Sequence, residues 1–392
     1  MRCLFSLFAS LFVCVAAHGL FAQDAPVEFT SVGEVRADQA VAKSFTLQGE
    51  YLSSEDIEGH KLGLQVIADG NDKFRFTVYL GGLPGGDWKP EMSYGTGTIT
   101  LKDDNTLEFV LRKFTSSIGD LPDGLLSKPL TAKFERGQGA GQGAGGRGQR
   151  RGENGGNAQP ARPSSKIIVA GQDPAPEITF EKVVRRSPTL GAKAPEGATV
   201  IFDGTNVDKF EAGAKINELQ PRGNNANNAS PQRVLWSEAV VKPFEKDKPY
   251  TLHIEFINTF MPTKQGQARS NSGVYIAESY ECQVLDSFGH VPPQNNECGG
   301  FYQIKAPIVN ACYPPLTWQT YDIDYTPAKY ADGKKTANAR VTVKQNGVTI
   351  QDDVELPKET PGRKAEADEA RGLYLQGHGN KVQYRNIWVK YN

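Results

Sequence analysis

Two short segments of this 392-residue chain carry the residue types that acid–base chemistry needs. Glu281 and Gln283 alternate with apolar side chains in Tyr280–Leu285, and Glu255 does the same in Tyr250–Ile257. This period of two predicts half-buried strands, each with one face toward a core. The opposite faces would present a carboxylate, in one case beside an amide. Together the two strands are expected to form the floor of a sugar-binding cleft.

The composition indicates a mainly β protein. The chain contains 41 Gly and 24 Pro, and its β-branched and aromatic runs are short and end in Gly, Asn or Asp. Its length allows two domains, each with a core of its own. The formal net charge of −1 gives no global attraction to nucleic acid or to an acidic membrane surface, so neither is expected as a partner.

The first 22 residues read as a secretory signal. Arg2 precedes an apolar run and then small residues, with cleavage expected after Ala17 or Ala22. An uncleaved anchor is the alternative, but the run is short for a bilayer, and bulky Val13 argues against a lipoprotein at Cys14. No later stretch is apolar enough to cross a membrane. The mature chain is therefore expected in the periplasm or outside the cell.

Export also shapes the interpretation of the cysteines. Cys282, Cys298 and Cys312 remain in the mature chain, at spacings that do not resemble a zinc site. Cys282 falls on the apolar face of its strand, where a buried free thiol is expected. Cys298 and Cys312 fall in Gly/Pro-rich sequence, where a disulfide between them is expected to hold a long loop.

A smaller β domain, either barrel or sandwich, is expected over residues 23–190. Turn-rich sequence separates its strand candidates, which are Phe45–Tyr51, Leu62–Ile67, Phe74–Leu80, Thr98–Leu101 and Leu107–Leu111. Residues 137–163, rich in Gly and Arg, have almost nothing to bury and are expected to form a disordered insertion. The Arg/Gly pattern resembles RNA-binding tracts, but the exported, near-neutral chain favours a flexible linker.

The second domain is expected over residues 198–392. Many short strand candidates predict two packed antiparallel sheets, as in a jelly roll. They are Val234–Trp236, Tyr250–Ile257, Gly273–Ile276, Tyr280–Leu285, Thr320–Tyr325, Arg340–Lys344, Val348–Ile350, Leu373–Gln376 and Val382–Val389. Asn346-Gly347 stands between two of these runs and predicts a tight hairpin.

Several motifs of the second domain occur together in a known family. They are Phe202-Asp-Gly-Thr, Arg269-x-Asn-Ser-Gly-Val-Tyr275, Tyr280-Glu-x-Gln-Val-Leu-Asp286, Asn296-Glu-Cys-Gly, Trp318-Gln-Thr-Tyr-Asp-Ile, His378-Gly-Asn and Arg385-Asn-Ile-Trp. In this order they resemble the 3-keto-disaccharide hydrolase domain, over about residues 199–392. The resemblance implies a concanavalin A-like jelly roll and an oligosaccharide or glycoside substrate. Gly377 departs from the pattern, because the family has Asp there.

The acidic residues fit ordinary double displacement poorly. Laminarinase-type enzymes on this fold place acids on alternate positions of one strand, so that nucleophile and acid share a face. Here Gln283 cannot ionise, and Asp286 has the wrong parity to share the face of Glu281. A 3-keto sugar offers another route, since the ketone acidifies the C2 hydrogen and lets the C1 group leave by elimination. Water then adds to the unsaturated ketone.

Elimination needs a base, an acid and donors for the enolate oxygen. Glu281 is the expected base, with Glu255 or Asp286 in support as acid or as ligand of a possible divalent cation. The remaining polar candidates are expected to contact substrate or complete the site: Arg269, Asn271, Gln283, Glu297, Trp318 and His378. Each also has a structural interpretation, such as a loop ion pair for Arg269, a loop cap for Glu297 or a core aromatic for Trp318.

The sequence therefore predicts an all-β, exported enzyme that cleaves 3-keto-glycosides, with a β domain ahead of it. A non-catalytic, lectin-like carbohydrate-binding protein on the same fold is the alternative. Convergent carboxylates and a histidine at the site would favour catalysis, whereas lone aromatics and amides would favour binding. A surface interaction module, suggested only by the first domain and the Gly-rich tract, is a third interpretation.

Overall fold

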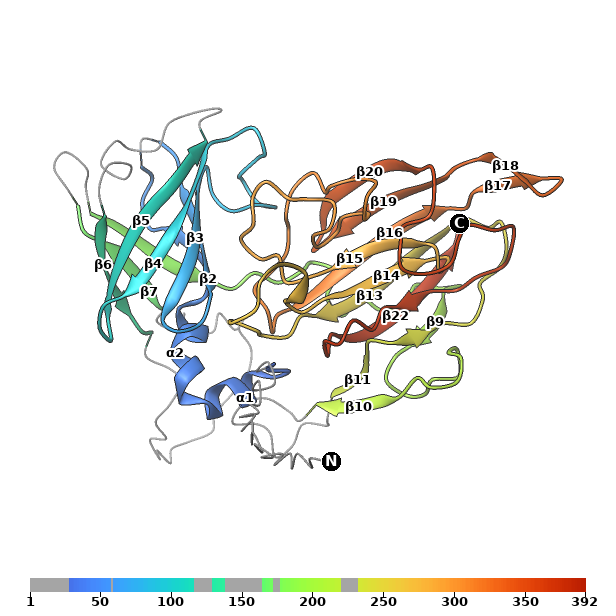
Figure 1. Cartoon of the computed structure of the whole chain (residues 1–392), viewed down its shortest axis with the longest axis horizontal. Helices are drawn as coiled ribbons and strands as arrows, with labels where there is room; N and C mark the ends of the chain where they lie inside the picture. The colour runs from blue at the N-terminus through green and yellow to red at the C-terminus, as the bar shows by residue number, and fades with distance from the viewer. Residues whose placement is uncertain (1–27, 58, 116–128, 138–163, 172–176, 220–231) are drawn as a thin grey trace, which may run out of the picture.

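The computed structural model of the chain describes residues 28–57, 59–115, 129–137, 164–171, 177–219 and 232–392. The expected signal segment and residues 138–163 of the Gly/Arg-rich tract lie outside the described residues. The described part forms a closed β barrel beside a larger assembly of sheets (Figure 1). Its few helices are short, and the expected all-β class is confirmed. No helix of the described ranges is long and apolar enough to span a membrane.

The N-terminal part is a closed barrel of eight antiparallel strands. Of the barrel and the sandwich that the sequence allowed, the structure therefore has the barrel. β1 pairs with both β2 and β8, which closes the ring. Apolar side chains such as Leu64, Phe109 and Ile167 fill its interior. The strands are β1 Gly49–Ser53, β2 Leu62–Ala68, β3 Lys73–Leu80, β4 Tyr94–Leu101, β5 Thr106–Thr115, β6 Leu130–Glu135, β7 Lys166–Val169 and β8 Ile178–Val183.

Two short helices, α1 Val32–Ala37 and α2 Gln39–Leu47, precede the barrel. Asp38 caps α2, because its side chain accepts a hydrogen bond from the Ala40 main chain. The strand expected over Phe45–Tyr51 is therefore wrong in its first half, since β1 begins only at Gly49. The ring of Phe45 packs edge-on against the ring of Phe260 instead, with the ring centres 5.2 Å apart.

The C-terminal part is a sandwich of two main sheets. The larger sheet has the order β10-β11-β22-β13-β16-β19-β20, with β9 also paired to β22, and the smaller has the order β12-β21-β14-β15. Their strands are β9 Thr199–Phe202, β10 Ile216–Leu219, β11 Gln232–Trp236, β12 Ala239–Val240, β13 Tyr250–Ile257, β14 Ser272–Ile276, β15 Tyr280–Val284, β16 Trp318–Thr326, β19 Ala339–Gln345, β20 Val348–Leu356, β21 Tyr374–Leu375 and β22 Gln383–Tyr391. A 3-10 turn, η3 Gly266–Ala268, precedes β14, and β17 Lys329–Ala331 pairs with β18 Lys334–Ala337.

Apolar side chains from both sheets meet in one core, including Ile254 and Ile323 from the larger and Val274 and Cys282 from the smaller. Tyr321 also reaches across, donating from its hydroxyl to the Gln283 carbonyl at 2.6 Å. Alternate residues on the inner strands therefore face either this core or an outer surface.

The expected hairpin at Asn346-Gly347 is confirmed. These two residues join β19 to β20 with φ angles of 53° and 80°. Positive φ at both central positions is the geometry of a tight hairpin turn, which Asn-Gly adopts readily.

The barrel and the sandwich touch through hydrogen bonds and apolar contacts. Thr77 Oγ1 on β3 donates to the Gly289 carbonyl at 2.7 Å. Arg185, just after β8, places its guanidinium 5.1 Å from the ring centre of Tyr313. Phe260 of the sandwich side belongs to the apolar cluster of the barrel.

Candidate active site

The β14–β15 hairpin presents polar side chains on one face of the smaller sheet. Tyr275 pairs with Glu281 across the two strands, and Gly273 pairs with Gln283. The alternate residues, including Cys282, belong to the core between the sheets. Glu281 and Gln283 therefore point away from that core, as the alternation predicted. The strand is buried on both faces, however, so the expectation of a half-buried strand is wrong.

Glu281 lies over the one position of the hairpin that has no side chain. A Cβ added to Gly273 would lie 2.4 Å from Glu281 Oε1 and 2.9 Å from its Cγ. Glycine at this position therefore leaves the space that the carboxyl group occupies. The Glu281 main chain donates to Thr360 Oγ1 at 2.7 Å, and the residue is only 3% exposed.

Burial sets the acidity of Glu281. Removal from water raises the pKa of Glu281 to about 7, and the nearby Tyr275 hydroxyl opposes this shift. The same hydroxyl donates to the Pro361 carbonyl at 2.9 Å and accepts from Gln376 Nε2 at 3.3 Å. A carboxyl group with a pKa near neutrality can both take and return a proton at pH 7.

Amide side chains lie around this carboxyl group. Gln267 orients two of them, because its Nε2 donates to the Asn296 carbonyl at 2.7 Å and leaves Oε1 free to accept. Asn271 Nδ2 donates to that oxygen at 3.1 Å and Gln283 Nε2 at 3.4 Å. Gln376 follows β21, on the other side of β14 from β15.

Sequence reasoning missed four residues of this arrangement: Gly273, Tyr275, Gln267 and Gln376. Gly273 and Tyr275 stand two and four positions after Asn271. Alternation along this strand could therefore have placed all three on one face. Gln376 gave no such signal, because its place depends on β21 pairing with β14. Gln267 lies in η3, outside any strand pattern.

The expected cleft floor built from β13 and β15 is wrong. β13 lies in the larger sheet and β15 in the smaller. Glu255 and Glu281 both point away from the shared core, so they project from opposite outer faces of the sandwich. Alternation identifies which side of a strand is polar but not which sheet the strand joins.

Glu255 instead has a complete set of partners on its own face. Its carboxylate accepts from Arg385 Nε at 2.6 Å, from Asn386 Nδ2 at 2.9 Å and from the Gly191 main chain at 2.5 Å. Burial alone would raise the pKa of Glu255, but hydrogen bonds with His253 and Asn386, the Arg385 charge and the Gly191 amide lower it to about 2. This carboxylate therefore stays charged and holds the sheet to the segment before β9.

Asp286 and Arg269 form a buried ion pair. Arg269 Nε donates to Asp286 Oδ2 at 2.6 Å, and both side chains are almost fully enclosed. Arg269 Nη1 also donates to the Ala68 carbonyl of β2 at 2.9 Å. The structural interpretation of Arg269 is therefore the one that these contacts favour, and Asp286 is engaged away from Glu281.

Glu297 and Trp318 also make structural contacts. Glu297 Oε1 lies 2.6 Å from His290 Nδ1, and its Oε2 accepts from the Gln294 main chain at 2.9 Å. Trp318 starts β16 in the larger sheet, where the Arg385 guanidinium lies 4.0 Å from its ring centre. Trp318 therefore lies in the other sheet from Glu281.

His378 is exposed in the loop after β21. The same loop contacts the polar face, because Asn380 Oδ1 accepts from the Asn271 main chain at 2.7 Å. His378 is thus next to the candidate site and exposed to solvent. At Gly377, where the resemblance led us to expect Asp, a Cβ would lie 2.8 Å from the Glu238 side chain, so Glu238 takes that space.

The disulfide expected between Cys298 and Cys312 is absent, as Cys282, Cys298 and Cys312 are all free and buried. Cys298 Sγ lies 3.2 Å from the Tyr321 hydroxyl, and Cys312 Sγ lies 3.5 Å from the Tyr313 carbonyl. Packing and hydrogen bonds hold the loop that the bridge was expected to hold. The expectation that Cys282 is a buried thiol is confirmed.

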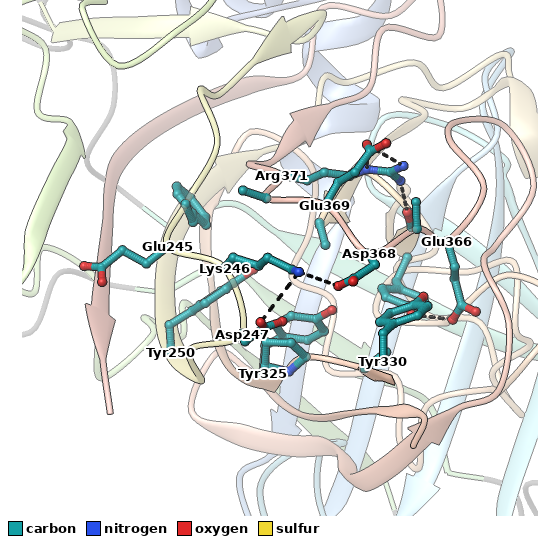
Figure 2. Close-up of a pocket in the computed structure, with 18 residues that line it drawn as sticks. Glu245, Lys246, Asp247, Tyr250, Tyr325, Tyr330, Glu366, Asp368, Glu369 and Arg371 are labelled. Atoms are coloured by element: carbon teal, nitrogen blue, oxygen red, sulfur yellow. Dashed lines mark hydrogen bonds and ion pairs between the residues drawn. The ribbon is translucent and has the colours of Figure 1, made fainter. Parts of the chain in front are cut away.

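A separate pocket of about 60 Å³ opens on the core side of β15 (Figure 2). Tyr250, Tyr280 and Tyr325 line it, together with charged residues that pair with one another. One such pair joins Lys246 Nζ to Asp368 at 2.6 Å. Glu281 and Gln283 do not line this pocket. Among the described residues, no group of three or more His, Cys, Asp or Glu side chains could hold a metal ion.

The polar face around Glu281 lies within a part of the chain that matches a known family. Residues 197–390 match the family model described as a 3-keto-alpha-glucoside-1,2-lyase-like domain. This part of the chain belongs to that family. The resemblance carried by the sequence motifs is thereby confirmed. The lyase-like domain takes in both main sheets of the sandwich and leaves the barrel outside.

No curated protein matches the chain. Two solved structures from Parabacteroides distasonis, each described as a candidate glycosyl hydrolase, are similar to it. The first is 28% identical over 50% of this chain and 84% of its own, with a TM-score of 0.40. The second is 16% identical over 50% of this chain and 94% of its own, with a TM-score of 0.30. By its family, the lyase-like domain is a carbohydrate-acting enzyme domain.

Proposed function

We propose that the lyase-like domain cleaves glycosides whose sugar ring carries a ketone at C3. Membership of the 3-keto-α-glucoside-1,2-lyase-like family supports this substrate class. The observation that carries the proposal is Glu281, a carboxyl group that is buried on a polar sheet face and has its pKa raised to about 7. We propose further that the chain acts outside the cytoplasm, because residues 1–22 have the pattern of a secretory signal.

Glu281 acts as the base in this proposal. Its carboxylate takes the proton from C2. The electron pair of the broken C2–H bond then forms the C1=C2 double bond, and the oxygen on C1 leaves with the aglycone. The carboxyl group that has received the proton can return it to the leaving oxygen, so one residue serves both transfers. Water then adds across the double bond, with hydroxyl at C1 and hydrogen at C2.

The ketone is essential to this route. Without it, the C2 hydrogen is far too weakly acidic for a carboxylate, whereas the ketone spreads the developing charge onto the C3 oxygen. The proposal needs only one carboxyl group, which Glu281 supplies, and Glu255 and Asp286 each pair with an arginine side chain instead. Because Glu281 is 3% exposed, sugar entry requires a flanking loop to move.

The decisive experiment compares wild type with Glu281→Gln on methyl 3-keto-α-glucoside and on unoxidised methyl α-glucoside. Wild type should cleave only the keto sugar. Glu281→Gln keeps the shape of the side chain but cannot accept the proton, so cleavage should fall by a factor of about 10² or more while the fold persists. Equal cleavage of both sugars by wild type would reject elimination, and full activity in the variant would move the base elsewhere.

A lectin-like protein on the same fold is the second candidate, and the amide-rich character of the face favours it. It would bind the keto sugar without turnover. Binding of the sugar by wild type with no release of methanol over long incubation would therefore support this alternative.

A further inference from the structure

Four buried oxygen atoms around Gly273 have no hydrogen-bond donor. They are Asn271 Oδ1, Glu281 Oε1, Gln283 Oε1 and Gln376 Oε1. Gln283 stands directly opposite Gly273 on β15, and the Gln376 main chain donates to the Gly273 carbonyl from the other side at 2.8 Å. The Glu281 carboxyl group lies over Gly273 itself. One glycine is thus surrounded by unpaired acceptors.

The three amide groups are held with their oxygens free. Asn271 Nδ2 donates to the Gln267 main-chain oxygen at 2.9 Å, and only an amide NH₂ can make that bond to a carbonyl. Gln283 Nε2 donates to Gln267 Oε1, whose orientation is set in turn by the Asn296 carbonyl. Gln376 Nε2 donates to the Tyr275 hydroxyl. Each amide NH₂ group therefore donates to another group of the protein, and each amide oxygen is left without a hydrogen bond.

Unpaired buried acceptors are costly, so a ligand that supplies donors is favoured at this place. A divalent cation is a poorer match, because calcium takes about 6–8 oxygen ligands and this set offers one carboxyl oxygen and three amide oxygens. Hydroxyl groups of a sugar are a good match, since each offers one O–H donor.

We propose that Asn271, Gln283 and Gln376 form an acceptor subsite that binds hydroxyl groups of the sugar ring next to Glu281. This inference rests on the proposed function for the sugar class but concerns binding alone. Gln376, which the pairing of β21 with β14 brings to the hairpin, becomes a specificity-determining residue together with its anchor Tyr275 on β14.

The test measures affinity by calorimetry in the full chain carrying Glu281→Gln, so that no turnover occurs. The probes are methyl 3-keto-α-glucoside and its 4-deoxy and 6-deoxy analogues. Adding Gln283→Met or Gln376→Met should weaken binding about three- to tenfold each. Each deoxy analogue lacks one hydroxyl group. At least one methionine variant should therefore bind the parent sugar and one of the analogues equally well, because the variant has already lost the amide that contacts the missing hydroxyl.

Gln383→Met is the matched control. Gln383 is also buried with an unpartnered Oε1, but it lies on β22 in the larger sheet, so its loss should leave affinity unchanged. If the methionine variants fail to fold, the analogues still decide, because at least one deoxy sugar should bind the Glu281→Gln chain about three- to tenfold more weakly than the parent.

The outcomes separate this inference from the proposed function. Unchanged affinity in both variants and for both analogues would overturn the subsite even if wild type cleaves the sugar. Calcium, magnesium or manganese binding that needs these amides would overturn it in favour of a cation site. Amide-dependent sugar binding without cleavage by wild type would support the subsite and reject the lyase proposal. Absence of any sugar binding would reject both.

Discussion

At the residue scale, the environment of Glu281 distinguishes it from the other acids of the chain. Glu255 has a similar strand pattern in the sequence, yet cations and amides lower its pKa to about 2, whereas burial raises the pKa of Glu281 to about 7. The same side chain thus serves as a permanent charge in one place and as a proton acceptor and donor in the other.

Gly273→Ala should damage the site without damaging the fold. The added Cβ would lie 2.4 Å from Glu281 Oε1, so the carboxyl group must move, and a misplaced base costs a factor of about 10². Cleavage of the keto sugar should fall by about that factor, with a small change in Tm. Gly33→Ala, where the nearest atom lies 3.8 Å away, is the control. Unchanged cleavage by Gly273→Ala would show that the carboxyl position is not critical.

Tyr275→Phe should shift the pH profile of cleavage upward. The Tyr275 hydroxyl lowers the pKa of Glu281 against the larger effect of burial, so its removal lets the pKa rise from its value of about 7. The base must be ionised to act, so the acidic limb of kcat/KM should move to higher pH, with activity restored in alkali. A profile that falls uniformly at every pH would indicate a purely structural role for Tyr275.

At the element scale, the segment before β9 is held on the outer face of the larger sheet. Thr189 Oγ1 donates to Asp322 Oδ2 at 2.7 Å, and the Gly191 main chain donates to Glu255. His253 contacts the same aspartate, with its Nδ1 2.6 Å from Asp322 Oδ1. Its ring stacks on that of Trp388, with the ring centres 5.1 Å apart. This connection between barrel and sandwich therefore depends on a buried, charged network.

Stability should decrease as the pH rises above neutrality because of His253. Burial alone would lower the pKa of His253, but hydrogen bonds with Asp322 and Glu255 outweigh burial and raise it. The protonated histidine therefore stabilises the fold fully below the unfolded pKa of about 6.5, and this contribution is lost as the pH passes the higher folded pKa.

Urea unfolding between pH 5 and 9 measures this effect. His253→Asn should flatten the upper part of the curve of unfolding free energy against pH, whereas His60→Asn, at an exposed position, should leave it unchanged. A curve of identical shape in wild type and His253→Asn would contradict the assignment.

At the scale of the whole molecule, Arg269 joins the two parts of the structure. It pairs with Asp286 of the sandwich and donates to the Ala68 carbonyl of the barrel. A residue that the sequence suggested for substrate therefore stabilises the contact between barrel and lyase-like domain.

Arg269→Met should cost about 3–5 kcal/mol of unfolding free energy, because it leaves the buried Asp286 carboxylate without a charge to pair with. Arg340→Met is the control, since Arg340 and its partner Asp353 are largely exposed and such a pair contributes about 0–1 kcal/mol. Chemical denaturation measures both. A loss in Arg269→Met no greater than that in Arg340→Met would show that the buried pair contributes little.

The sequence by itself determined the polarity of each strand face, the Asn346-Gly347 turn and the family of residues 197–390. These features are local, because alternation depends on neighbouring residues and the turn on two φ angles. From them alone Glu281 and Gln283 could be placed together on an outward face, with Asn271 two positions from Gly273 on the adjacent strand.

Only the tertiary structure decided what lies across from that face. Glu255 lies in the larger sheet and Glu281 in the smaller. The pairing of distant strands places Gln376 beside Gly273, about a hundred residues away in the chain. Arg269 and Asp286 form an ion pair with each other. It also left Cys298 and Cys312 unbridged. Pairing between distant strands depends on the burial of many side chains at once, and no short pattern in the chain specifies it.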